Sequence, residues 1–145
     1  MKQAIAKLVE RNIRRGLLFA MVGSIGFVVG ETILTAGLEV FGRSHWTVIY
    51  AVQAFCSVTV GFLLNEQVTV KRDGDLSGGI TGGIIRLIKF QLVFALGNVI
   101  AYLVTNLLFA SLAVWPPIGN IAGAIVAYPV NYVVSMGFVW KIRVN

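Results

Sequence analysis

The sequence predicts an all-α membrane protein with four transmembrane helices, and its composition is the first reason. Of its 145 residues, 57% are hydrophobic and 12% are charged, with a mean hydropathy of +0.84, whereas ordinary soluble domains are about 25% charged. A bilayer core about 30 Å thick requires roughly 20 apolar residues per helix. Four runs meet this length, at residues 16–41, 46–70, 87–113 and 117–140. Little sequence remains outside them, so one four-helix transmembrane domain is expected over residues 1–145.

The basic residues predict how the helices are oriented. Eleven of the twelve lysines and arginines lie before the first run, between the second run and the start of the third, or after the fourth, whereas Arg43 lies in a connection on the other side. Basic residues accumulate in cytoplasmic segments, so both termini are expected to be cytoplasmic. The asymmetry argues against insertion in both orientations. It also accounts for the net charge of +6 without a nucleic-acid partner.

Two cytoplasmic segments lie outside the runs. Residues 1–15 place apolar side chains on one helical face with basic residues around them, which predicts an amphipathic helix on the anionic inner leaflet. Alternatively, the segment is a basic anchor that only sets the topology. Residues 71–86, KRDGDLSGGITGGIIR, are rich in glycine but lack the G-x-x-x-x-G-K-[ST] pattern of nucleotide-binding loops. We therefore expect a flexible linker there.

Small residues form stripes along two of the runs, where they would let helix backbones approach closely. They are Gly23, Gly26, Gly30 and Gly37 in the first run, and Gly119, Gly123 and Ala127 in the fourth. Pro129 is expected to kink the fourth helix and to leave one backbone carbonyl without its helical partner.

The two halves of the chain resemble each other. A shift of 74 residues aligns Arg15 with Lys89 and Gly23 with Gly97. A shift of 70 aligns the end of the second run with that of the fourth. A basic start, an early glycine and an aromatic-to-basic end recur in both halves. This pattern predicts two parallel two-helix repeats, an arrangement known among transporters.

Short motifs at the ends of the runs resemble the GtrA-like family over essentially the whole chain. They are the F-x-x-V-G start at Phe19–Gly23 and two ends similar to N-F-x-x-x-R-x-W-x-F, here GFLLNEQVTV and NYVVSMGFVW. The motif asparagine is Gly61 in the second run and Asn131 in the fourth, and the motif arginine is Glu66 and Met136. The family consists of four-span proteins associated with moving polyprenyl-phosphate-linked sugars across the membrane for cell-surface glycan assembly. The resemblance implies that fold and that function.

Glu31 is the single charged residue between Gly16 and Leu38. An acidic residue near a helix centre costs roughly 2.5–3.5 kcal/mol on insertion scales, so it normally faces a bundle interior or a wet cavity. Removal from water favours the protonated carboxyl, which makes Glu31 a candidate for polar binding or proton coupling. Alternatively, it is a structural glutamate hydrogen-bonded to another helix.

A line of polar residues follows the third run. Asn98, Tyr102 and Asn106 are spaced i, i+4, i+8, and Tyr128 and Asn131 add to them from the fourth run. Amide and phenol groups pair with sugar hydroxyls, so the line predicts a path for a sugar head group. Alternatively, these residues form hydrogen bonds between helices, which are typically worth ~0.6–2 kcal/mol per bond.

Polar and basic residues also gather at the predicted cytoplasmic ends. Asn65 and Glu66 close the second run, and five cations lie at the same level: Arg15, Lys71, Arg72, Arg86 and Lys89. Arginine binds phosphate bidentately, so this group is a candidate contact for a lipid phosphate. Alternatively, the cations are topology signals and anchors to anionic lipid.

The residues that catalysis or metal binding would need are sparse. One histidine and one cysteine do not make the usual clustered metal sites, and no nucleophile–base–orienter set is visible. We expect neither an enzyme nor a bound cofactor.

Three functions remain open on the sequence. The first is translocation of a polyprenyl-phosphate-linked sugar, by a parallel homodimer because four helices make a thin wall. The second is a non-transporting membrane adaptor that anchors a glycosyltransferase. The third is a small proton-coupled multidrug exporter with Glu31 in an aromatic-lined cation site.

Overall fold

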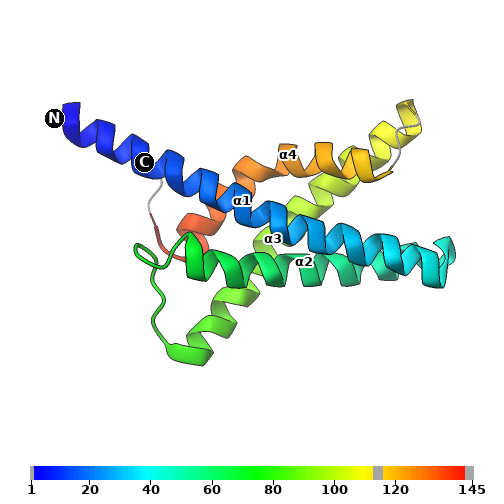
Figure 1. Cartoon of the computed structure of the whole chain (residues 1–145), viewed down its shortest axis with the longest axis horizontal. Helices are drawn as coiled ribbons and strands as arrows, with labels where there is room; N and C mark the ends of the chain where they lie inside the picture. The colour runs from blue at the N-terminus through cyan, green and yellow to red at the C-terminus, as the bar shows by residue number, and fades with distance from the viewer. Residues whose placement is uncertain (1, 113–115, 143–145) are drawn as a thin grey trace.

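Four long helices dominate the computed structural model, which describes residues 2–112 and 116–142. They are α1 (Lys2–Phe41), α2 (Trp46–Val68), α3 (Gly79–Leu112) and α4 (Pro116–Val134), shown in Figure 1. Each carries a stretch long and apolar enough to cross a membrane. Large apolar side chains such as Met21, Phe55, Leu92 and Ile125 are exposed on all of them, as lipid-facing residues are. The predicted all-α, four-span architecture is confirmed, and the chain is a multi-pass membrane protein.

Several element boundaries differ from the expected ones. Residues 2–15 do not form a separate helix but continue directly into the first span within α1; the side chains of residues 2–9 lie outside the described part. The expected linker over residues 71–86 is helical from Gly79 onward. Gly78 and Gly79 turn the chain with positive φ angles of 88° and 54°. The apolar segment that follows can then continue the third span inward.

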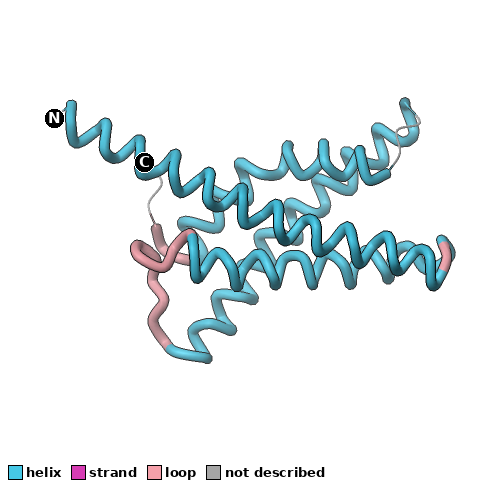
Figure 2. Tube along the Cα trace, in the orientation of Figure 1, coloured by secondary structure: helices cyan, strands magenta, loops and turns pink. Residues whose placement is uncertain are grey.

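The other connections are short. A single 3₁₀ turn, η1 (Arg43–His45), joins α1 to α2 after Gly42, whose φ is 76°. At the other end of the chain, α4 passes through Pro129 and widens into a π-helical turn, η2 (Ser135–Val139). Figure 2 shows the 69–78 connection as the one extended loop among the described residues.

The helices form two antiparallel hairpins, α1–α2 and α3–α4, that cross each other (Figure 1). Glycines bring the helices of each hairpin together. A Cβ on Gly26 would lie 2.8 Å from the backbone oxygen of Ser57, and one on Gly123 would lie 2.6 Å from the Cα of Ala101. The stripes therefore pack as expected, except at Gly23, where a Cβ would meet nothing within 4 Å.

Aromatic side chains fill the crossing of the hairpins. Phe19 is 2% exposed, and its ring centroid lies 5.4–6.4 Å from those of four rings of the second hairpin. Phe62 of the first hairpin stacks on Trp140 at 6.2 Å with an interplanar angle of 8°. We call these rings the aromatic core: Phe19, Phe62, Phe90, Phe94, Tyr128, Tyr132 and Trp140. Its edge-to-face and stacked pairs add directional attraction to the burial of apolar area.

α1 and α3 both start at the end of the molecule that carries the 69–78 loop, and α2 and α4 run back toward it (Figure 1). This is the arrangement that two parallel repeats would have, and the repeat itself stays a prediction. We call the end with the 69–78 loop the inner end and the end with η1 the outer end.

The predicted orientation can be tested by labelling, because Cys56 is the single cysteine of the chain. In a Cys56→Ala background, we expect Ser44→Cys, at the outer end, to react with a membrane-impermeant maleimide in intact cells. Ser77→Cys, in the inner loop, should react only after the membrane is permeabilised. Both positions are exposed. Labelling of Ser77→Cys but not Ser44→Cys in intact cells would reverse the orientation.

Candidate functional site

A cavity of about 460 Å³ lies between all four helices, on the outer side of the aromatic core. We call it the central cavity. Its wall is mostly apolar, with polar groups contributed by Ser24, Tyr50, Gln53, Ser57, Asn98, Tyr128 and Asn131. None of the described residues that line it carries a charge. Its size falls in the range of roughly 300–1,000 Å³ that is common for small-molecule sites.

The exposed part of the cavity wall lies on one side in the described part of the chain. Its exposed lining residues all belong to α1 or α4, namely Ser24, Val28, Ile121 and Ile125. In the bilayer, this side faces lipid. The outer parts of the two hairpins diverge in Figure 1.

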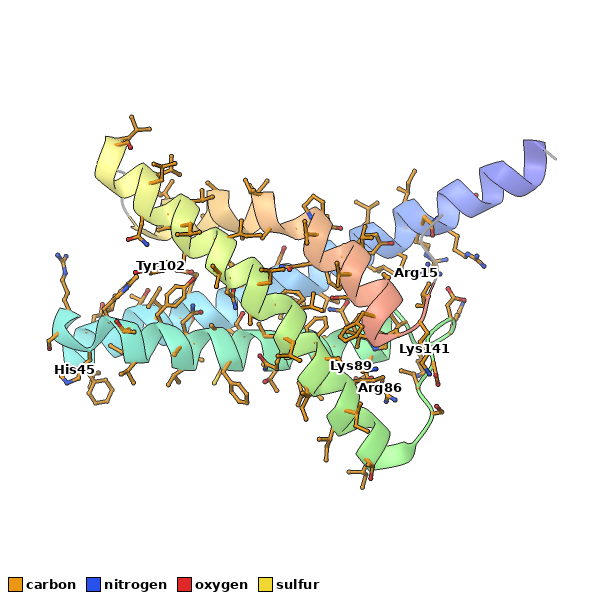
Figure 3. The ribbon with its side chains drawn as sticks, turned by 180° about the vertical axis from the view of Figure 1, so that it is seen from behind. Arg15, His45, Arg86, Lys89, Tyr102 and Lys141 are labelled. Atoms are coloured by element: carbon orange, nitrogen blue, oxygen red, sulfur yellow. The ribbon has the colours of Figure 1, made fainter. Side chains whose placement is uncertain are left out.

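Contacts between helices close the other sides. Gln91 of α3 donates to the hydroxyl of Thr59 at 2.9 Å and to the carbonyl of Phe55 at 3.2 Å, both on α2. Farther out, the rings of Tyr50 and Tyr102 meet edge to face with centroids 5.9 Å apart. Tyr102 projects from α3 toward α2 in Figure 3.

Two tyrosines join α1 to α4 on the inner side of the cavity. The hydroxyl of Tyr128 donates to the carbonyl of Gly16 at 2.7 Å, and that of Tyr132 donates to the carbonyl of Asn12 at 3.3 Å. Together with Phe19, they separate the cavity from the inner end.

Asn131 is the most distinctive polar group of the cavity. The residue is 8% exposed, and its amide oxygen is buried without a hydrogen-bond partner. It packs on Gly97 of α3, where any Cβ would overlap the amide. A buried acceptor without a partner is costly in an apolar medium, so a hydrogen bond to this oxygen from a group in the cavity would be favourable.

The predicted polar line of α3 does not share one surface. Asn98 lines the cavity, whereas Tyr102 packs on Tyr50 outside it. Asn106 is exposed and donates to the carbonyl of Tyr102 in its own helix at 2.8 Å. The physical reason is that a spacing of four residues drifts by about 40° per step around an α-helix. A line of three such residues therefore turns away from the facing helix.

Glu31 lies beside the central cavity but does not line it. It is half-buried and interacts electrostatically with Tyr50, which does line it. Glu31 also lines a second hollow on the outer half of α1, together with Thr32, Thr35 and Glu39. The aromatic-lined cation site around Glu31 that an exporter would need is not the central cavity.

Ion pairs cover the inner end. Arg15 contacts Asp73 at 2.6 Å, Arg86 contacts Glu66 at 2.5 Å, and Lys141 contacts Asp75 at 2.6 Å. Arg86 also donates to the carbonyl of Ser77 at 2.8 Å. These bonds tie the 69–78 loop to α1, α3 and the chain after η2. Figure 3 shows Arg15, Arg86, Lys89 and Lys141 gathered at this end.

The Asp75 carboxyl is ionised over the whole physiological range. Hydrogen bonds from Lys141 and Ser77 hold the pKa of Asp75 well below its usual range. A lowered pKa in the folded protein means that this tie contributes fully above the ordinary aspartate pKa. The contribution is lost only as the pH falls through the lowered value.

The cations proposed to contact phosphate therefore fall into separate groups. Arg15 and Arg86 are buried and already paired with carboxylates. Lys71 and Arg72 are exposed and make no ion pair within the described part of the chain. The Lys89 ammonium lies 5.1 Å from the centroid of the Phe138 ring, in a cation–π contact.

The side chain of Asn65 is hydrogen-bonded within the end of its own helix. It is buried, donates to the carbonyl of Gly61 at 2.8 Å, and accepts from the hydroxyl of Thr69 at 2.6 Å. All these partners belong to the end of α2, so Asn65 does not reach the cavity. Glu66 next to it is held by Arg86 and by the Trp140 indole, which donates at 3.4 Å.

The polar residues that α2 contributes to the cavity were not among the predicted ones. Gln53 and Ser57 line the cavity from α2, and Ser57 donates to the carbonyl of Gly26 at 2.8 Å. With Tyr50 they are spaced i, i+3, i+7, which is a helical face. The same periodicity that singled out Asn98 would have found them. Among the described residues, no group of histidine, cysteine, aspartate and glutamate could hold a metal ion.

Comparison with known proteins assigns this arrangement to a family. The family described as GtrA/DPMS, transmembrane domain, matches residues 18–140, which is most of the chain and all four spans. Comparisons with curated proteins and with solved structures gave no match. The chain belongs to the GtrA/DPMS transmembrane-domain family.

Proposed function

We propose that this protein translocates a polyprenyl-phosphate-linked sugar across the cell membrane for cell-surface glycan assembly. Membership of the GtrA/DPMS family fits a role in handling such lipids. The observation that carries the proposal is the central cavity: its polar groups lie between the membrane-spanning helices, and its exposed lining residues belong to α1 and α4. A lipid could place its head group there while its chain stays in the bilayer.

The cavity would replace the water that the head group loses. Sugar hydroxyls removed from water need new partners, because an unpaired polar group in an apolar medium is costly. Asn98, Asn131, Gln53 and Ser57 supply amides and a hydroxyl at this depth. The prenyl chain would pass through the apolar opening that Val28 and Ile121 border.

Movement between leaflets requires a second conformation. In the present one, the bonds from Tyr128 to Gly16 and from Tyr132 to Asn12 close α1 against α4 on the inner side. We propose that these bonds and the Phe19 contacts separate when the head group enters from the inner leaflet. Alternation of this kind between related halves is the usual mode of repeat-built transporters.

Exposed cations would collect the lipid phosphate at the inner surface. Lys71 and Arg72 are free of ion pairs within the described chain, and Lys89 lies at the same end (Figure 3). Arg15 and Arg86 would bind phosphate only by releasing Asp73 and Glu66. Phosphate is a bidentate acceptor for arginine just as a carboxylate is. The lipid phosphate could therefore replace the carboxylate as the partner of each arginine.

Two partners follow from the proposal. A second parallel copy would thicken the wall around the opening, and a membrane glycosyltransferase would supply or use the sugar lipid. Cross-linking in native membranes tests both, since it would capture a second copy or another membrane protein.

Transbilayer movement in proteoliposomes tests the proposal. The substrate is polyprenyl-phosphate glucose, scored by its accessibility to an impermeant oxidant outside the vesicle. We expect the wild type to move it faster than empty vesicles do. Ala124→Phe, which fills the cavity wall, should abolish the gain. Ala51→Phe, the same change at an exposed position of α2, should retain it.

Glu31→Gln separates coupling from packing in the same assay. If Glu31 couples a proton to movement, the glutamine variant should lose its response to a transmembrane pH gradient. An unchanged response would leave Glu31 a structural residue beside Tyr50. If the wild type moves no more lipid than empty vesicles, translocation fails and the adaptor becomes the better hypothesis.

A further inference from the structure

The wall of the central cavity is polar but uncharged. Its polar side chains are amides, hydroxyls and phenols, and no described lining residue is Asp, Glu, Lys, Arg or His. An ion placed there would lose its hydration without gaining a counter-charge, which is far more costly than burying a neutral hydroxyl that finds a partner. The cavity is therefore matched to a neutral polar group.

One buried acceptor in this wall has no partner. The amide oxygen of Asn131 is buried without a hydrogen-bond partner, and Asn131 lines the cavity. This oxygen needs a donor, because an unpaired polar group in an apolar medium is costly. Hydroxyls of a sugar are such donors.

The position of the Asn131 amide depends on a glycine of the facing helix. Gly97 lets the amide lie against the α3 backbone, since any Cβ there would overlap it. The position 70 residues earlier is Gly61, where a Cβ would meet nothing within 4 Å. The second hairpin therefore contributes an amide at this position, whereas the first hairpin does not. The amide is held in place by its packing against Gly97.

We infer that the central cavity selects an uncharged sugar, and that Asn131 is the residue that recognises one of its hydroxyls. This inference rests on the proposed function, because it names the class of head group that the same site accepts. The phosphate stays outside the uncharged wall. The cavity volume of about 460 Å³ includes the part that opens to lipid. This volume suits one or two sugar rings rather than a long oligosaccharide.

The substrate class is tested with the wild-type protein alone. Three polyprenyl-phosphate lipids are compared in proteoliposomes: one with glucose, one with a glucosamine whose amine is free, and one with glucuronic acid. We expect the glucose lipid to move at least about tenfold faster than either charged lipid, the effect of leaving one buried polar group unsatisfied. Equal rates for glucose and glucuronic acid would overturn the inference while leaving translocation in place.

Asn131 is tested by changing its charge without changing its shape. Asn131→Asp should slow the glucose lipid and speed the glucosamine lipid, since the carboxylate then pairs with the amine. Asn131→Leu should slow the glucose lipid without speeding the glucosamine lipid. A structural role for Asn131 would slow all three lipids alike in both variants, and that result would overturn its assignment.

Binding without translocation separates the two hypotheses. Thermal unfolding of the protein in a detergent that contains no sugar is measured with octyl glucoside or octyl glucuronide added below its micellar concentration. We expect the glucoside to raise the unfolding temperature of the wild type but not that of Asn131→Leu, and the glucuronide to raise neither. This outcome would support the inference even if no lipid were moved. Failure of the glucoside to bind the wild type would overturn it.

Discussion

Gly123→Leu is expected to prevent α3 and α4 from packing as a hairpin. A Cβ at this position would lie 2.6 Å from the Cα of Ala101 and 2.7 Å from its carbonyl oxygen. Both are backbone atoms, so no side-chain rotation relieves the overlap and the helices must separate. Overpacking in a core typically costs about 1–3 kcal/mol, and we expect the upper part of this range or more because a backbone is displaced.

The measurement is the unfolding midpoint of the purified protein in detergent, followed by circular dichroism. The matched control is Gly137→Leu, where a Cβ would meet nothing within 4 Å and the residue is exposed. The control should unfold close to the wild type. If both leucine variants unfold at the same midpoint, the close approach at Gly123 does not hold the hairpin together.

Arg86→Gln is expected to loosen the inner end more than any other single change there. Arg86 is 8% exposed and binds both Glu66 and the carbonyl of Ser77. Its loss leaves a half-buried carboxylate and a loop carbonyl without partners, and breaking such a pair typically costs about 3 kcal/mol. We expect the 69–78 loop to detach from α3.

Hydrogen exchange of the loop amides reports this detachment directly. Exchange between residues 73 and 78 should speed up in Arg86→Gln and partly recover in the double variant Glu66→Gln/Arg86→Gln, where no unpaired charge remains. Lys141→Gln removes an exposed pair at the same end and should change exchange only near Asp75. Unchanged exchange in Arg86→Gln would show that the loop is held by other contacts.

Much of the fold was predictable because it depends on local properties. The four spans follow from apolar length, and the expectation that glycine stripes pack against neighbouring helices is met at Gly26, Gly30 and Gly123. The start of α3 was missed because a glycine-rich segment resembles a linker until the turn at Gly78 and Gly79 is known. Composition alone does not reveal where such a segment becomes helical.

The candidate site was predictable in part. Asn98, Tyr128 and Asn131 line the cavity as the polar pattern suggested, whereas Tyr102 and Asn106 lie outside it. The cations at positions 15 and 86 were expected at the inner end, and they lie there, but paired with acids of the 69–78 connection and the end of α2. Their partners are 58 and 20 residues away in sequence, so spacing carries no sign of them.

By itself, the sequence determined that this chain crosses a membrane with four helices, because hydropathy is summed along a contiguous segment. It also determined that the family motifs and most of the positive charge lie at the ends of those helices. Only the tertiary structure decided which polar residues share one cavity and which cations are already neutralised. Both depend on how the two hairpins cross, and that crossing is filled by aromatic rings brought together from distant parts of the chain.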